Sequence, residues 1–521
     1  MVSLVLLAAV AVPLGVGAAL MAGDRLGRPV GHTGAWAVAM LASVVTLAAC
    51  VAAVVTDAHI DKPWVPGLGM RLHLATDGIS APLVILAAAV TLLAVAVSSR
   101  QRPKGTPGLF YGCLLVVLGG AVAAFSVRDA VAFFIAFEVV LVPMWVLIDR
   151  FGDAAADRRR AGWMFVLYTV GGSMFMLAGI LLLVVSAGTS DLERLAGGAA
   201  AALPFPIAMT AGVLLTLGLA VKVPLIGVHS WLPRAHTAAP TAGSMLLAAV
   251  LLKLGTYGFI RLVVLPLPVA WRTIAPVIAV LAVVGIIVGG LVCLVERDLK
   301  RLVAWSSIAH MGFVMLALAA GQQIGLQAAL YGNIAHGVIS ALLFAVVGAL
   351  KARRGAVDVD EPMVGLRNSD PRLGFALVVG TAAAIGLPGL AGFWGEILAL
   401  FAAWGAPHRP GALFHVLTAV AAFGAVLAAA YGVRVLRAVW AGERAPEAAD
   451  ATLGTSDGAT PASTAGEHAE ASASVATERV VGLEWLAIGV LVAAVFVLGL
   501  APTLLMNVAD ADLPRLLGGL K

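Results

Sequence analysis

Residues 219–261 read LAVKVPLIGVHSWLPRAHTAAPTAGSMLLAAVLLKLGTYGFIR and carry two lysines inside apolar sequence. Lys222 and Lys253 are the only Lys or Arg residues that we place within hydrophobic spans of this chain. A charged side chain in the middle of a bilayer costs several kcal/mol, so a residue of this kind is a functional candidate by default. The apolar sequence around both lysines predicts helices that span a membrane.

Composition assigns the chain to the integral membrane proteins. Hydrophobic residues make up 61% and charged residues 12% of the 521 residues, which excludes a soluble globular domain. The net charge of +5 comes from basic residues in short loops between apolar segments, so we expect the lipid bilayer and no nucleic acid as a partner. Cys50, Cys113 and Cys293 fall in predicted spans without paired or metal-ligand spacing. We therefore expect small core residues there, with no metal site.

The apolar segments predict an all-α polytopic fold with about fourteen transmembrane helices. They lie near residues 2–22, 31–56, 78–98, 108–127, 129–149, 162–187, 205–230, 239–262, 271–293, 302–320, 328–350, 373–404, 412–433 and 482–505. The odd-numbered loops carry most of the Lys and Arg residues, which predicts that these loops face the cytoplasm and that both termini lie on the outer side. Residues 443–476, rich in Ala, Ser, Thr and Gly, predict a disordered cytoplasmic loop.

Ionisable residues recur along the middle of the chain, at Glu138, Lys222, Lys253, His310, His336 and Glu396. A carboxylate near a buried lysine favours the charged ammonium, so a movement of the partner switches the lysine between its two states. Histidine titrates near neutral pH and relays protons. The series therefore predicts a proton path. A structural ion pair is the alternative for the Glu and Lys residues, and plain packing is the alternative for the histidines. His229 and His236 are secondary candidates.

Prolines accompany three of these charges. Pro143 follows Glu138, Pro224 follows Lys222, and Pro388 precedes Glu396 on the same predicted span. A proline inside a helix frees the carbonyl four residues earlier, and broken helices at membrane depth usually line a cavity. Each proline alone is equally compatible with a simple kink, but their joint placement beside charges favours a functional site.

The spacing of the ionisable residues suggests an internal duplication. Glu138 and Lys222 are about as far apart in sequence as His310 and Glu396, and each pair runs from a plain helix to a broken one. Two consecutive five-helix units would have opposite orientation, as in inverted-repeat transporters. We expect N-terminal helices in 1–107, a first repeat in 108–262, a second repeat in 263–440, a disordered loop in 441–480, and a last helix with a short tail in 481–521.

Five segments resemble the antiporter-like subunits of respiratory NADH-quinone oxidoreductase, or complex I. They are FEVVLVPMWVLI around Glu138, LAVKVPLIGVHSWLP around Lys222, the run from His229 to Arg261, RLVAWSSIAHMGFV around His310, and GLPGLAGFWGEILAL around Glu396. The likeness extends over most of the chain. Within this family it favours the M subunit, because the L and N subunits carry a lysine where Glu396 stands.

The resemblance implies that quinone reduction in a neighbouring arm drives protons through this chain. It implies no redox centre or cofactor here, with NAD, FMN, Fe–S clusters and quinone in partner subunits. It also implies L-type and N-type antiporter-like subunits as neighbours in a bacterial plasma membrane. A subunit of a stand-alone Na⁺/H⁺ antiporter is the alternative. The chain departs from the family at Arg234 and Ala238, where acidic residues are usual, so the contacts of that loop stay open.

Overall fold

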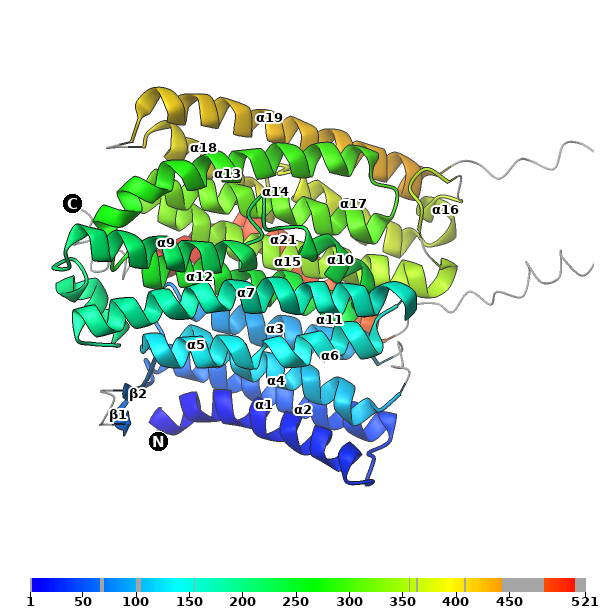
Figure 1. Ribbon diagram of the computed structural model, residues 1–521. Coiled ribbons are helices and arrows are strands. Elements are labelled where there is room, and N and C mark those ends of the chain that lie inside the picture. Colours follow the sequence, from blue (N-terminus) through cyan, green and yellow to red (C-terminus); the bar gives the residue numbers. More distant parts are fainter. Residues whose placement is uncertain are drawn as a thin grey trace, which may run out of the picture.

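The computed structural model describes residues 2–65, 70–99, 105–153, 155–355, 357–361, 364–406, 409–442 and 482–510. The predicted loop at 443–476 lies outside these residues. Helices run roughly parallel to one another through the whole bundle (Figure 1). The N-terminus and a short β-hairpin lie at one end of the bundle, which we call the hairpin end, and α16 (Leu366–Ser369) lies at the opposite end.

Twelve helices among the described residues are long and apolar enough to cross a membrane. They are α1 (Val2–Arg25), α2 (His32–Val55), α4 (Pro107–Ser126), α5 (Ala130–Val139) with α6 (Leu141–Phe151), α7 (Ala155–Ala187), α9 (Phe205–Lys222), the span Thr241–Val264, α13 (Pro268–Val295), α14 (Leu299–Ala320), α15 (Gln323–Arg354), α19 (Gly411–Val435) with the π-helical η5 (Leu436–Ala441), and α21 (Leu483–Leu500).

Three apolar helices are shorter, namely α3 (Ala81–Val97), α17 (Pro371–Ala384) and α18 (Ala391–Trp404). The span Thr241–Val264 consists of α11 (Thr241–Leu246), the π-helical η3 (Leu247–Leu251), α12 (Leu252–Gly258) and the π-helical η4 (Phe259–Val264). Short elements complete the order: α8 (Leu192–Arg194), η2 (Leu195–Ala199), α10 (Trp231–Ala238) and α22 (Thr503–Asp510). The all-helical membrane fold is confirmed, whereas the count of fourteen spans stays a prediction.

The fold contains one feature that the all-α prediction lacks. Strands β1 (His59–Val65) and β2 (Met70–Ala75) pair antiparallel between α2 and α3, with His59 opposite Ala75. A loop outside the bilayer offers its backbone water or a neighbouring strand as hydrogen-bond partners, so short strands form there without cost to the helical bundle.

Helix burial separates the centre of the bundle from its surface. The apolar windows of the span Thr241–Val264 and of α15 are 100% buried, and that of α14 is 89% buried. By contrast, the window of α1 is 28% buried, and its exposed residues include Leu4 and Leu7. The buried helices are the ones that carry Lys253, His310 and His336. A lipid-facing shell therefore surrounds a core that contains Lys253, His310 and His336.

Helix breaks occur beside the three prolines. The chain turns at Val140 between α5 and α6, and residues 223–230 separate α9 from α10. Residues 385–390 separate α17 from α18, with Gly386 and Gly389 at φ values of +71° and +89°. Glycine adopts these left-handed conformations without the steric cost of a Cβ. The predicted breaks are thus confirmed.

The statement that only Lys222 and Lys253 lie within spans is wrong. Arg261 belongs to the span Thr241–Val264, Lys300 belongs to α14, and both are 5% exposed. Each lies in the terminal turns of its span, where Arg261 pairs with Asp77 and Lys300 Nζ lies 2.8 Å from Asp153 Oδ2. Long cationic side chains near helix ends reach carboxylates or water beyond the apolar core. A charged side chain near the end of a span therefore costs much less than one in the middle of a span.

Candidate functional site

Four of the six predicted site residues form an unbroken series of contacts. Lys253 Nζ on α12 lies 2.5 Å from Nδ1 of His336 on α15. The ring of His336 is 5.6 Å from that of His310 on α14, measured between centroids. His310 Nδ1 in turn lies 3.1 Å from Oε1 of Glu396 on α18. The structure therefore brings residues from four helices into one line from lysine to carboxylate.

The helix around Lys253 has an irregular hydrogen-bond pattern. The π-helical segments η3 and η4 lie on either side of α12. Lys253 Nζ donates to the Ala248 carbonyl at 2.9 Å, five residues earlier, and is fully buried. A π-turn is frequent at functional sites because it loosens the regular backbone ladder. It gives the ammonium a second polar partner beside His336 in an apolar core.

Beside Glu396, at the carboxylate end of the series, lie a glycine of the helix break and a small cavity. A Cβ on Gly386 would lie only 2.6 Å from Glu396 Oε2, so this glycine makes room for the carboxylate at the helix break. A cavity of about 20 Å³ is lined by residues that include His310, His336 and Glu396. One water molecule needs about 10–15 Å³ of such space together with polar partners. The histidines and Glu396 can therefore share a water.

Glu138 and Lys222 are arranged differently from these four. Glu138 Oε1 accepts a hydrogen bond of 2.5 Å from the Ser173 hydroxyl of α7, and no ion pair with Lys222 occurs among the described residues. Lys222 Nζ has no hydrogen-bond partner in the described part of the chain, although the residue is 2% exposed. It lies 4.6 Å from the ring centroid of Phe137 and 5.8 Å from that of Phe165.

The aromatic faces compensate only part of the cost of this position. A cation over an aromatic ring gains about 0.5–2 kcal/mol, whereas an unpaired buried charge costs several times more. Gly255 of α12 packs against the Cβ of Lys222, which joins this region to the helix of Lys253. Ile135 and Val139, which flank Glu138 on α5, are 45% and 37% exposed. Glu138 therefore lies near the lateral surface of the bundle.

The secondary candidates lie outside the series of contacts. His236 on α10 is fully buried, and its ring stacks on Phe344 with centroids 4.6 Å apart. Its two ring nitrogens lack partners among the described residues. His229 lies in the break before α10, where its ring contacts Trp305 and its Nδ1 lies 3.1 Å from the Gly227 amide.

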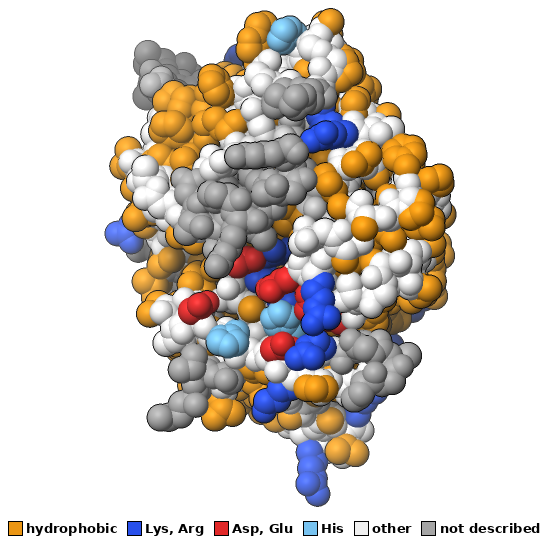
Figure 2. Space-filling model, turned by 90° about the vertical axis from the view of Figure 1, so that its left-hand side faces the viewer, with side chains coloured by type: hydrophobic (Ala, Val, Ile, Leu, Met, Phe, Trp, Pro, Cys, Tyr) orange, Lys and Arg blue, Asp and Glu red, His pale blue; other side chains and the backbone are white. Residues whose placement is uncertain are grey.

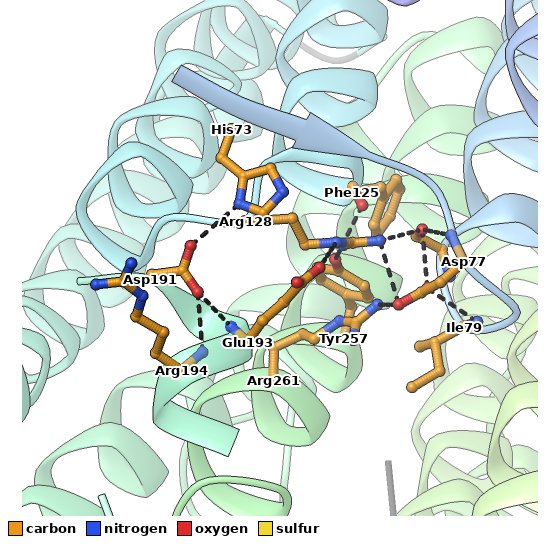
Figure 3. A network of polar contacts seen from close by, with 11 residues as sticks. His73, Asp77, Ile79, Phe125, Arg128, Asp191, Glu193, Arg194, Tyr257 and Arg261 are labelled. Carbon is orange, nitrogen blue, oxygen red and sulfur yellow. Dashed lines mark hydrogen bonds and ion pairs between the residues drawn. The ribbon is translucent and has the colours of Figure 1, made fainter. Parts of the chain in front are cut away.

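A charged cluster at the hairpin end is absent from the sequence-based candidates. Figure 2 shows acidic, basic and histidine side chains gathered near the centre of this face. Arg128, only 1% exposed, donates to the Tyr257 hydroxyl at 2.8 Å and lies 3.2 Å from Asp77 Oδ2 (Figure 3). Arg261 pairs with the same carboxylate. Burial raises the pKa of Asp77, but the guanidinium groups of Arg128 and Arg261 outweigh it and hold this pKa well below its usual range.

The same end contains a histidine–carboxylate pair. His73 Nδ1 on β2 lies 3.1 Å from Asp191 Oδ2, just before α8 (Figure 3). This hydrogen bond raises the pKa of His73. Burial raises the pKa of Asp191, but the bond from His73 and the backbone amides of α8 lower it more. The pair fastens the hairpin to the bundle. The sequence offered one sign of the charged cluster: Arg128 and Asp129 directly follow a complete apolar span.

The three cysteines are free and buried, as expected. In the described part of the chain, no group of three or more His, Cys, Asp or Glu residues is arranged to hold a metal ion.

Comparisons with known proteins show which family the chain resembles. The family described as NADH:quinone oxidoreductase/Mrp antiporter, TM matches residues 128–422. NAD(P)H-quinone oxidoreductase chain 4 from a Synechococcus strain is 37% identical over 388 residues, covering 74% of this chain and 72% of that protein. NADH-quinone oxidoreductase subunit M of Escherichia coli is 35% identical over 410 residues, covering 76% of this chain and 77% of that protein.

Solved structures share the fold. A chain of respiratory complex I from Thermus thermophilus superposes with a TM-score of 0.81 at 27% identity, with 100% of both chains covered. A chain of the Mrp complex from Dietzia also gives a TM-score of 0.81, at 22% identity and with 98% of this chain and 52% of that chain covered.

Proposed function

The chain belongs to the NADH:quinone oxidoreductase/Mrp antiporter family of membrane subunits, and we propose that its buried Glu, Lys and His residues carry protons across the bilayer. Its relatives at 35–37% identity are subunit M or chain 4 of the oxidoreductase. The chain is thus a multi-pass membrane subunit of a proton-translocating NADH-quinone oxidoreductase. Quinone reduction elsewhere in the complex drives the protons, and NAD, FMN, Fe–S clusters and quinone belong to partner subunits.

The observation that carries this proposal is the contact series Lys253, His336, His310 and Glu396. Each neighbour lies within hydrogen-bond reach or across a ring contact that one water spans. A proton on Lys253 Nζ passes to His336, then through water to His310, and from there to Glu396. Glu138 and Lys222 supply the charge step of the first half. Because Glu138 lies near the lateral surface, we assign it the link to an adjacent subunit.

The proposal includes the surroundings of the chain. The neighbours are the L-type and N-type antiporter-like subunits of the same complex, in a bacterial plasma membrane. The hairpin end faces outward, and the end with α16 faces the cytoplasm. Residues 108–262 and 263–440 form two inverted five-helix repeats, and both contain broken helices. The remaining units are 1–107, 441–480 and 481–521.

Glu396→Gln tests the relay, because it keeps the shape of the side chain and removes its ionisation. The complex is reconstituted in vesicles, NADH-driven quinone reduction and proton pumping are recorded together, and assembly is checked by native gel. We expect pumping to fall roughly tenfold or more. The exposed Glu361→Gln serves as the matched control and should leave both rates unchanged. Normal pumping in an assembled Glu396→Gln complex would refute a relay through Glu396.

A stand-alone cation/proton antiporter is the second candidate, because the Mrp chain shares the fold. That antiporter would exchange Na⁺ for protons without NADH or quinone. The same vesicles are therefore given a sodium gradient in the absence of NADH. We expect no proton movement, and sodium-driven proton movement would favour the antiporter.

A further inference from the structure

A basic cavity opens at the end of the bundle opposite the hairpin, away from the relay. Its volume is about 260 Å³, whereas the cavity beside His310 and Glu396 is about 20 Å³. It is lined by Asp157, Arg160 and Ala161 from the first turns of α7, by Arg234, Thr237 and Ala238 from α10, and by Arg301 from the first turn of α14. We call it the arginine cavity.

Positive charge in the arginine cavity is only partly neutralised within the chain. Arg301 Nε lies 3.2 Å from Glu296 Oε2, so one guanidinium has a carboxylate partner. Among the described residues, Arg234 donates to the Met164 sulfur, at 3.2 Å. Neither Arg234 nor Arg160 forms an ion pair with any described residue. Asp157 is the one carboxylate that lines the cavity. An anion that enters this cavity therefore meets two guanidinium groups, those of Arg160 and Arg234, that have no carboxylate partner among the described residues.

Two helix N-termini adjoin the cavity. Helices α7, of 33 residues, and α14, of 22 residues, both begin beside it. The start of a helix carries a partial positive charge that favours anions. At α14 the Asp298 carboxylate already accepts from the Arg301 amide, so the start of α7 contributes more to an incoming anion. Guanidinium groups bind phosphate in a two-pronged geometry that a single ammonium does not offer. Both the helix starts and the guanidinium groups therefore favour a phosphate group in this cavity.

The surroundings of the cavity point to a lipid as the source of the phosphate. On the turns of α7 that follow Arg160, Trp163 is 56% exposed and Leu167 is 67% exposed. An exposed tryptophan next to basic residues is typical of the membrane interface. Acyl chains can lie along this apolar face of α7 while the headgroup reaches the guanidinium groups. Basic pockets between transmembrane helices on the cytoplasmic side bind anionic headgroups in this way.

We propose that the arginine cavity, with Arg160 and Arg234 as the main contacts, binds the phosphate of an anionic phospholipid. The bound phosphate neutralises the guanidinium groups of Arg160 on α7 and Arg234 on α10 and so ties α10 to α7. Because α10 continues the broken helix of Lys222, a bound lipid holds the position of that helix. The lipid site itself does not depend on the proton relay, and its test uses a different readout.

The test compares lipid binding to the whole purified complex. Wild type and Arg160→Gln/Arg234→Gln are delipidated in detergent and titrated with phosphatidylglycerol or phosphatidylcholine, and bound lipids are counted by native mass spectrometry. We expect the double variant to bind phosphatidylglycerol about 30-fold more weakly at one site, roughly fivefold for each arginine. Phosphatidylcholine binding should be equal in both proteins. Equal phosphatidylglycerol binding in both would overturn the proposal.

Two further arms sharpen the outcome. Arg159→Gln removes an exposed arginine from the same turn of α7 that does not line the cavity, and it should bind like wild type. Arg160→Lys/Arg234→Lys should restore most of the binding, which a merely misfolded double variant would not allow. Inorganic phosphate alone is titrated as a separate probe. Phosphate binding as tight as that of phosphatidylglycerol would assign the cavity to a free anion and overturn the lipid.

Discussion

The buried charge series has two parts, whose side chains contact one another differently. We call Glu138 with Lys222 the first half, and the series from Lys253 to Glu396 the second half. In the second half, Lys253, His336, His310 and Glu396 already contact one another in sequence. In the first half, Lys222 faces aromatic rings, and Glu138 bonds to Ser173 instead. A connected series conducts with small proton shifts, whereas a separated pair must move a side chain before charge can pass. In the proton path proposed above, the first half therefore acts as a switch and the second half as a relay.

The largest effect is expected at Lys222, because the switch has no other cation. Lys222→Ala should lower proton pumping and coupled NADH oxidation roughly tenfold or more in an assembled complex. The exposed Lys62→Ala on the hairpin is the control and should behave like wild type. Unchanged rates in an assembled Lys222→Ala complex would assign this lysine to structure and remove the switch from the comparison.

Double variants measure the difference between the two halves directly. Lys253 and His336 are in contact, so we expect a coupling free energy of about 1–2 kcal/mol in the pumping rate when Lys253→Ala and His336→Ala are combined. Glu138→Gln combined with Lys222→Ala should show a smaller coupling, because no direct ion pair joins these two side chains among the described residues. The cycle is completed with the four single variants. Equal coupling free energies for the two pairs would show that the two halves do not differ in how their side chains interact.

A smaller effect is expected at Ser173, whose hydroxyl donates a hydrogen bond to Glu138. Ser173→Ala removes one hydrogen bond to a carboxylate, so pumping should change by about two- to fivefold, with assembly intact. Thr169→Ala on the same helix is the control, because the Thr169 hydroxyl bonds only to carbonyls of its own helix. An identical change in both variants would indicate a general effect on α7 rather than on Glu138.

The smallest effect concerns the hairpin end, where charges fasten structure and stand outside the relay. The folded pKa of His73 is raised, so its bond to Asp191 contributes fully below about pH 6.5 and is lost as pH rises through the raised value. The folded pKa of Asp191 is lowered, so its contribution is present above about pH 4 and is lost as pH falls further.

Amide hydrogen exchange of residues 59–65 and 71–75 in the assembled complex measures this contribution. After correction for intrinsic exchange, protection should fall about two- to fivefold between pH 5.5 and pH 8.5. His73→Gln should give a flat profile over the same range while pumping is unchanged. A steep profile in His73→Gln would show that another group titrates there.

Sequence reasoning reached the membrane fold and the helix breaks because both follow from local rules. A single segment of about twenty apolar residues satisfies its backbone hydrogen bonds in lipid by forming a helix. A proline lacks a backbone N–H donor whatever its tertiary surroundings. It also identified the four residues that the structure joins. It missed Arg128 and Asp77 because their burial depends on the partner that each supplies, from segments about fifty residues apart. The hairpin was missed for the same reason, since its two strands stabilise each other.

The sequence alone determined which ionisable residues stand in the middle of apolar segments, because a charge there is costly and is therefore conspicuous without a structure. Only the tertiary structure decided which of them touch. Lys253 meets His336 because α12 packs in the same core as α15, while Lys222 meets Phe137 and Phe165 instead of Glu138. Contact depends on helix rotation and packing across distant segments, and no local pattern encodes a rotation that only the neighbouring helices fix.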